Sequence, residues 1–71
     1  MNDKSLERLR NMYPTGTRVR LLHMDDIQAP PYNTLGTIKN IDDMGTIHVS
    51  WDTGSSLGLV LGVDRFETVV N

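Results

Sequence analysis

The spacing of the apolar residues changes at Pro14, and this change limits the folds that the chain can adopt. Before Pro14, Leu6, Leu9 and Met12 recur every three residues with charged residues between them, which is typical of an amphipathic helix. Asp3 stands where it can cap this helix, and proline cannot continue it because its ring clashes with the preceding turn. We therefore expect one short helix that ends just before Pro14 and packs its single apolar stripe against the rest of the protein.

After Pro14 the apolar residues take up the period of two that β-strands have. Ile47, Val49 and Trp51 alternate with polar residues, so one face of this segment is apolar. Similar patterns predict five strands: one that starts at Thr17, then Leu35 to Ile41, Thr46 to Trp51, Leu57 to Leu61 and Phe66 to Val70. The longest irregular segment is His23 to Thr34, and its adjacent prolines exclude it from a central strand.

The predicted elements indicate a mainly β protein, a small five-stranded SH3-like barrel with a short N-terminal α-helix. Two tight hairpins, at residues 42–45 and 52–55, and a one-turn helical link at residues 62–65 complete the connections. This order and these loop lengths are those of SH3-like barrels, and a closed sheet would remove edges that so small a protein cannot otherwise cover. We divide the chain into a helical extension, residues 1–13, and the barrel, residues 14–71.

Composition excludes several classes of function. The 71 residues can bury only one modest core, so a deep substrate cavity within one chain is not expected. The chain has no cysteine, which excludes disulfides, thiolate nucleophiles and cysteine-ligated zinc. A net charge of −2 disfavours unaided attraction to nucleic acid or anionic lipid, and no apolar stretch is long enough to span a bilayer. We expect a cytoplasmic protein that does not contact membranes.

The segment Asp52-Thr53-Gly54-Ser55 has the letters of the catalytic loop of aspartic proteases. That chemistry needs two carboxylates that share a proton, so a chain this short could supply them only as a homodimer. Those enzymes also need a flap hairpin, and the seven residues from Ser55 to Leu61 leave no room for one before Gly62. A tight hairpin with Gly54 in a left-handed conformation explains the same letters, so we expect no catalytic residues.

His23, Asp25 and Asp26 are close in sequence and could ligate a divalent ion, with His48 as a more distant ligand. Adjacent aspartates in a loop usually face solvent or cap a turn, and no ligand spacing is set by this sequence. We therefore expect no metal and no cofactor.

Two groups of residues are candidates for a binding surface. In SH3-like modules a long acidic first loop and nearby aromatic residues form the peptide groove, which singles out Asp25, Asp26, Tyr32 and Trp51. Trp51, however, lies on the same face of its strand as the apolar residues Ile47 and Val49, which favours a position in the core.

Four basic or titratable residues form the second group. Arg18 and Arg20 project from the polar face of the first strand, Lys39 from the second and His48 from the third. If these strands are neighbours, the four side chains form a stripe that could follow a nucleic-acid backbone. The alternative is a solvated face with cross-strand charge pairs.

Several linked motifs resemble those of the bacterial domain-of-unknown-function family 4314: YPTGTRVRL at 13–21, HMDD at 23–26, GTIHVSWDTGS at 45–55 and GVDRF at 62–66. The resemblance implies a small SH3-like barrel found in bacterial and mobile-element genomes, without an assigned activity. The segment 49–55 is also similar to the V-x-W-D-x-G-S stretch of mind-bomb-type domains, which are SH3-like peptide-binding modules of eukaryotic ubiquitin ligases.

These observations lead to one hypothesis and one alternative. The first is a noncatalytic interaction module that binds a protein or peptide partner, as a monomer or as a weak homodimer through the apolar stripe of its helix. The alternative is a nucleic-acid-binding accessory protein of a mobile element.

Overall fold

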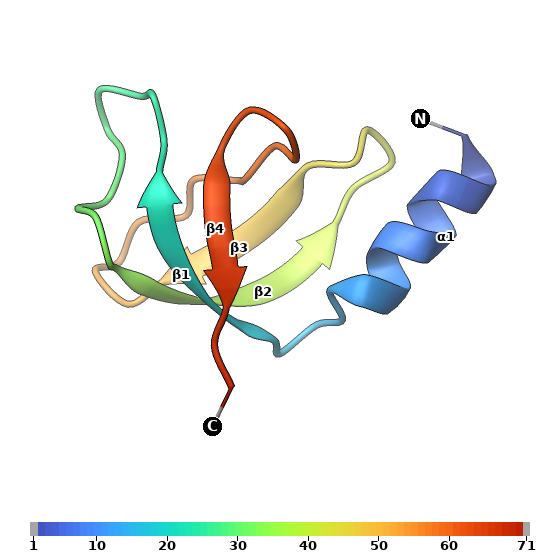
Figure 1. Ribbon diagram of the computed structural model, residues 1–71, viewed down its shortest axis with the longest axis horizontal. Coiled ribbons are helices and arrows are strands. Elements are labelled where there is room, and N and C mark those ends of the chain that lie inside the picture. Colours follow the sequence, from blue (N-terminus) through green and yellow to red (C-terminus); the bar gives the residue numbers. More distant parts are fainter. Residues whose placement is uncertain (1, 71) are drawn as a thin grey trace.

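One helix is followed by four strands in the computed structural model, which describes residues 2–70. The elements are α1 Asp3–Met12, β1 Arg18–His23, β2 Leu35–Ile41, β3 Ile47–Trp51 and β4 Arg65–Thr68. The strands form one antiparallel sheet in the order β3-β2-β1-β4. Figure 1 shows α1 at one end of the molecule and the long β1–β2 loop at the opposite end.

Helix α1 begins one residue earlier than the apolar pattern indicates. Asn2 is the N-cap, and its side-chain Oδ1 accepts a hydrogen bond of 2.8 Å from the backbone N–H of Ser5. The prediction that Asp3 caps the helix is therefore wrong, because Asp3 lies in the first turn, where its negative charge suits the helix dipole. The predicted end of the helix before Pro14 is confirmed, but Met12 is 58% exposed and does not join the buried stripe.

The helix and the sheet share one apolar core. Tyr13 and Phe66 cover its margin, with ring centroids 5.4 Å apart. The buried side chains that form this core are Leu6, Leu9, Val19, Leu21, Ile38, Ile41, Ile47, Val49, Trp51 and Leu59. Because α1 contributes two of these side chains, the extension completes the core that the sheet alone would leave partly uncovered.

The segment predicted as the fourth of five strands does not form one. Leu59 makes an isolated bridge with Ile47, in which Ile47 N–H donates to Leu59 O at 2.8 Å and Leu59 N–H donates back at 2.7 Å. The next residue, Val60, then bonds to Asp64: its N–H donates to the Asp64 carboxylate and its carbonyl accepts from Asp64 N–H. The chain therefore turns on itself after one bridge. The prediction of a partly open barrel of five strands is wrong in its strand number, because residues 2–70 form a sheet of four strands that does not close.

The link to the last strand also differs from the prediction. Residues 62–63 form a hydrogen-bonded turn and not one turn of helix, because Val63 N–H and Asp64 N–H both return to Val60 O. β4 begins at Arg65 and ends at Thr68, whereas the pattern predicted residues 66–70.

Two irregularities bend the sheet. One lies between Ile38 and Asn40 of β2, where Lys39 is the extra residue opposite β3, and the other lies between Leu21 and His23 of β1, opposite β4. Bulges of this kind increase the local twist of a strand. They allow four short strands to curve around the core (Figure 1).

Candidate functional site

The outer face of the sheet carries a hydrogen-bonded network centred on Arg18. Its Nη1 donates to Thr37 Oγ1 at 2.8 Å and to Asp52 Oδ1 at 2.9 Å, and its Nη2 donates to Asp52 Oδ2 at 2.7 Å. The guanidinium therefore binds the carboxylate through two parallel bonds, a strong and directional geometry. This hydrogen bonding lowers the pKa of Asp52 and raises the pKa of Arg18. Arg18 thus ties β1 across β2 to the turn after β3.

Arg20 is also bound to a carboxylate. It lies opposite Glu67 of β4 in the sheet register, and its Nη1 donates to Glu67 Oε1 at 2.9 Å. The two arginines on the polar face of β1 therefore form ion pairs with carboxylates, as the alternative to a nucleic-acid-binding stripe predicted. Each of its two arginines meets a carboxylate, which reduces the positive potential that a phosphate backbone would encounter.

Lys39 and His48, the other two members of the expected basic stripe, lie apart from this network. Lys39 is the exposed extra residue of the bulge in β2. His48 Nε2 lies 2.8 Å from Asp42 Oδ2, and Asp42 Oδ1 also accepts from the N–H groups of Met44 and Thr46 at 3.0 Å each. The bond with His48 and those with the backbone lower the pKa of Asp42. Asp42 and His48 therefore act together to hold the β2–β3 hairpin.

The Asp52-Thr53-Gly54-Ser55 segment forms the tight turn that follows β3. Gly54 has a φ of 98°, its N–H donates to Trp51 O at 2.9 Å, and Trp51 N–H donates to Ser55 O at 2.9 Å. A positive φ is the conformation that glycine adopts without strain. The left-handed glycine predicted for this turn is confirmed, and the carboxylate of Asp52 is bound to Arg18.

The β1–β2 loop contains three of the four predicted contact residues. Asp25 and Asp26 are exposed, and Tyr32 is 71% exposed at the end of the loop. Asp26 shapes the loop, since its Oδ1 accepts from Gln28 N–H at 2.7 Å and its carbonyl accepts from Ala29 N–H at 3.0 Å. Sequence reasoning missed Ile27, which is fully exposed at 102%. Its exposure could have been predicted, because Ile27 directly follows two aspartates in an irregular segment.

Trp51, the fourth predicted contact residue, is part of the core. Its side chain is 2% exposed, and its indole Nε1 donates to Leu57 O at 2.8 Å. The alternation of apolar and polar residues along β3 predicted this buried position. The ring is therefore not available as a binding surface, and its role is to attach the 57–59 segment to the sheet.

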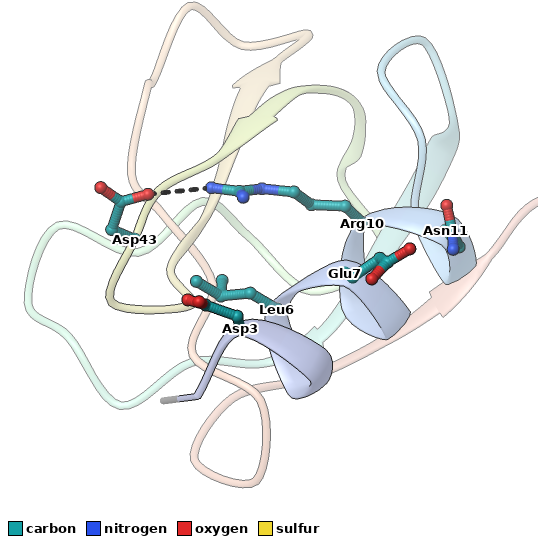
Figure 2. A pocket seen from close by; sticks show the side chains of 6 residues that line it. All are labelled: Asp3, Leu6, Glu7, Arg10, Asn11 and Asp43. Atoms are coloured by element: carbon teal, nitrogen blue, oxygen red, sulfur yellow. Dashed lines mark hydrogen bonds and ion pairs between the residues drawn. The ribbon is translucent and has the colours of Figure 1, made fainter.

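A cleft of about 640 Å³ lies between α1 and the β2–β3 hairpin. Figure 2 shows Arg10 reaching from the helix across this cleft toward Asp43. The guanidinium of Arg10 donates to Ile41 O from Nη2 at 2.9 Å and from Nε at 3.2 Å, and to Asp43 Oδ1 at 3.2 Å. The sequence contains no sign of this contact because the partners are more than 30 residues apart. The cleft is lined by Asp3, Leu6, Glu7, Arg10, Asn11 and Asp43.

Residues 2–70 lack two further features. No three histidine, aspartate or glutamate side chains lie close enough to hold a metal ion, so His23, Asp25, Asp26 and His48 are not gathered into one site. Within the same residues, no helix has the length and apolar character needed to cross a membrane.

Acid pH is expected to destabilise the protein through Asp42 and Asp52. Both carboxyl groups have lowered pKa values in the folded state, so their stabilising contribution is present above the unfolded pKa of about 3.9 and is lost as pH falls through the folded pKa. Urea unfolding at pH 7, 4, 3 and 2.5 should show a midpoint that falls below about pH 4.

The Asp52→Asn variant should weaken this pH dependence, whereas Ser50→Ala, on the same face of the sheet, should preserve it. A midpoint that stays constant from pH 7 to pH 2.5 in the unmodified protein would contradict the assignment of these two carboxylates.

Comparison with known proteins places the chain in a family. A family model described as "Domain of unknown function (DUF4314)" matches residues 2–69. Searches of curated proteins and of solved structures found no match. The match spans α1 and all four strands, so that the helix, the sheet and the β1–β2 loop all lie within the family domain. The chain therefore belongs to the DUF4314 family.

Proposed function

We propose that the protein is a noncatalytic interaction module that binds a positively charged, partly apolar segment of a protein partner through its β1–β2 loop. The observation that carries this proposal is the composition of the exposed surface of the loop. Ile27 and Tyr32 are exposed at 102% and 71%, and Asp25 and Asp26 supply two negative charges beside them. Within residues 2–70, neither aspartate takes part in an ion pair.

The charge of this loop determines the kind of partner. Exposed carboxylates attract lysine and arginine side chains and steer them during association, while exposed tyrosine and isoleucine can bury area against the stems of those side chains. A tyrosine at a binding surface contributes a large contact area and one hydroxyl at a small cost in conformational entropy. A basic peptide with apolar residues therefore fits the loop better than an acidic or uncharged one.

The outer face of the sheet supports the nucleic-acid alternative less well. Arg18 and Arg20 are bound to Asp52 and Glu67. A phosphate would have to displace a carboxylate at each position. Lys39 is exposed and lies outside every ion pair of the described residues, so it would be the strongest contact of such a surface.

The proposal includes an SH3-like arrangement for the whole domain. The isolated bridge of Leu59 with β3 extends the spatial order to 57–61, β3, β2, β1 and β4. This order supports the proposal, because an SH3-like sheet has five strands and residues 57–61 would take the place of one of them. In such domains the long loop between the first two strands contributes to peptide binding, which agrees with the role proposed for residues 24–34. A bacterial, cytoplasmic role in a mobile element is part of the proposal and rests on the family resemblance and on the lack of cysteine.

Amide chemical-shift mapping tests the proposed function. The ¹⁵N-labelled protein is titrated with a short peptide of arginine and leucine and, separately, with a single-stranded oligonucleotide of mixed sequence. We expect the peptide to shift amides of residues 24–33. Tyr32→Ser should weaken peptide binding about tenfold, because aromatic residues at the centre of an interface contribute most of its energy. Asp25→Asn should weaken it by a smaller factor that decreases as salt rises.

The matched control is Asp43→Asn, which removes the same charge from the β2–β3 hairpin, where the carboxylate is 96% exposed. Equal weakening by Asp25→Asn and Asp43→Asn would mean that the peptide senses only net charge, and the proposal would fail. Shifts along β1 and β2 with the oligonucleotide, strongly reduced by salt, would support the nucleic-acid alternative instead.

A further inference from the structure

Strand β4 has one paired edge and one open edge. Among residues 2–70 its only neighbour in the sheet is β1. Tyr13, the residue that follows α1, reaches this region and packs against Phe66. An open strand edge presents backbone N–H and C=O groups that can pair with another strand.

The register identifies which backbone groups of β4 face the open edge. Val69 N–H donates to Arg18 O at 2.9 Å, so the pair Arg18–Val69 is hydrogen-bonded. Such pairs alternate in an antiparallel ladder, and Glu67 therefore also points its backbone groups toward β1. The backbone groups of Phe66 and Thr68 point the opposite way, toward solvent.

The bonds of β1 on its other side agree with this assignment. Leu21, which lies opposite Phe66, directs its backbone groups away from β4: its N–H donates to Thr34 O at 2.9 Å, and its carbonyl accepts from Asn33 N–H at 2.8 Å. The outward direction at Phe66 thus follows from hydrogen bonds on both sides of β1.

The side chains of β4 carry complementary charges on one face. Arg65 and Glu67 are exposed and, being two residues apart, lie on the same face of β4. This is the outer face, where Glu67 is bound to Arg20. Arg65 takes part in no ion pair of the described residues. Charged residues usually protect a strand edge from pairing, but here they have opposite signs at positions two residues apart.

We propose that β4 pairs with β4 of a second copy of this chain, antiparallel and with Phe66 on the two-fold axis. In this register the outward N–H and C=O of Phe66 bond to those of the second Phe66. Arg65 then lies opposite Glu67 of the second copy, and the symmetry repeats the contact. This is a non-hydrogen-bonded position, where side chains are closest, so both charge pairs are attractive. The contact joins two four-stranded sheets into one.

The oligomeric state at increasing concentration tests this pairing. Sedimentation equilibrium from about 10 μM to about 1 mM, the range in which weak protein contacts form, should show a monomer–dimer equilibrium. In an Arg65→Glu dimer, the new glutamate of each copy would face Glu67 of the other copy. The repulsion at these two contacts should raise the dissociation constant about tenfold or more. This variant keeps the Arg20–Glu67 pair. Lys39→Glu is the matched control, because it makes the same charge change on β2 and should leave the dimer unchanged.

A mixing experiment tests the register itself. Arg65→Glu and Glu67→Arg chains should each be monomeric, but their equimolar mixture should form a heterodimer, since every contact between them joins opposite charges. Circular dichroism of each variant shows whether it folds. A mixture that stays monomeric while both variants are folded would overturn the proposal.

Hydrogen exchange supplies a readout that needs no substitution. The amide of Phe66 should exchange quickly in dilute protein and at least about tenfold more slowly in the concentrated protein, whereas Glu67 is protected in both. Fast exchange at Phe66 at about 1 mM would overturn the proposal, as would a dimer that Arg65→Glu does not weaken. Neither result depends on the β1–β2 loop, so these experiments test the dimer independently of the proposed peptide site.

Discussion

Replacement of Trp51 by alanine is expected to unfold the protein at neutral pH and room temperature. The side chain is 2% exposed at the centre of the core. Truncation of a buried tryptophan costs about 3–5 kcal/mol, while a domain of this size has roughly 3–5 kcal/mol of net stability. The variant also loses the bond from the indole N–H to Leu57 O, which attaches the 57–59 segment to the sheet.

The unfolding of Trp51→Ala is measured by far-ultraviolet circular dichroism and by the dispersion of amide resonances. Trp51→Phe is the informative control, because it keeps a large ring but leaves Leu57 O without its donor, and it should lose about 1–3 kcal/mol while it stays folded. Tyr32→Ala removes an exposed ring and should change stability by less than about 0.5 kcal/mol. A Trp51→Ala protein with a native spectrum and an unchanged urea midpoint would show that the core does not depend on this ring.

The second large effect is expected at Gly36, which lies opposite Trp51 in the β2–β3 register. A Cβ atom at this position would lie 2.5 Å from Val49 Cγ1 and 2.7 Å from Trp51 Cε3, both well inside van der Waals contact. Both neighbours are buried, and valine has few alternative rotamers, so neither can move away easily. Gly36→Ala should therefore reduce the free energy of unfolding by about 1–3 kcal/mol.

A double-mutant cycle tests whether the steric clash with Val49 causes this loss of stability. Val49→Ala removes the nearer of the two obstructing atoms, so Gly36→Ala should cost much less in a Val49→Ala protein than in the unmodified one. Ser50→Ala, at an exposed position of β3, serves as the control and should stay within about 0.5 kcal/mol. Additive costs of the two substitutions at positions 36 and 49 would rule out the steric explanation.

The parts of the fold that were predicted correctly are those with a strong local period. β2 matches its predicted bounds of Leu35–Ile41, and α1 ends where Pro14 requires. β3 ends at Trp51 as predicted but begins at Ile47, one residue after the predicted Thr46. The same pattern failed at residues 57–61. Leu57, Leu59 and Leu61 alternate as a strand would, but only Leu59 is fully buried, because the bonds between Val60 and Asp64 close a turn there.

The candidate site was predictable only in part, for a related reason. The sequence placed Asp25, Asp26 and Tyr32 in an exposed loop, since prolines and adjacent aspartates exclude that segment from the sheet. It could not show that Arg18 binds Asp52, because 34 residues separate them and their contact depends on three strands being adjacent. The bulge that displaces Lys39 was equally hidden, since it is a property of the pairing between β2 and β3.

The amino-acid sequence by itself determined the helix, the strand faces that turn inward and the segment that stays a loop. These properties follow from side-chain periodicity and from the backbone limits of proline and glycine, which act over a few residues. The tertiary structure alone decided which charges are paired and, among residues 2–70, that the sheet does not close and that β4 has an open edge. Those properties depend on register between distant segments, where a shift of one residue exchanges the two faces of a strand.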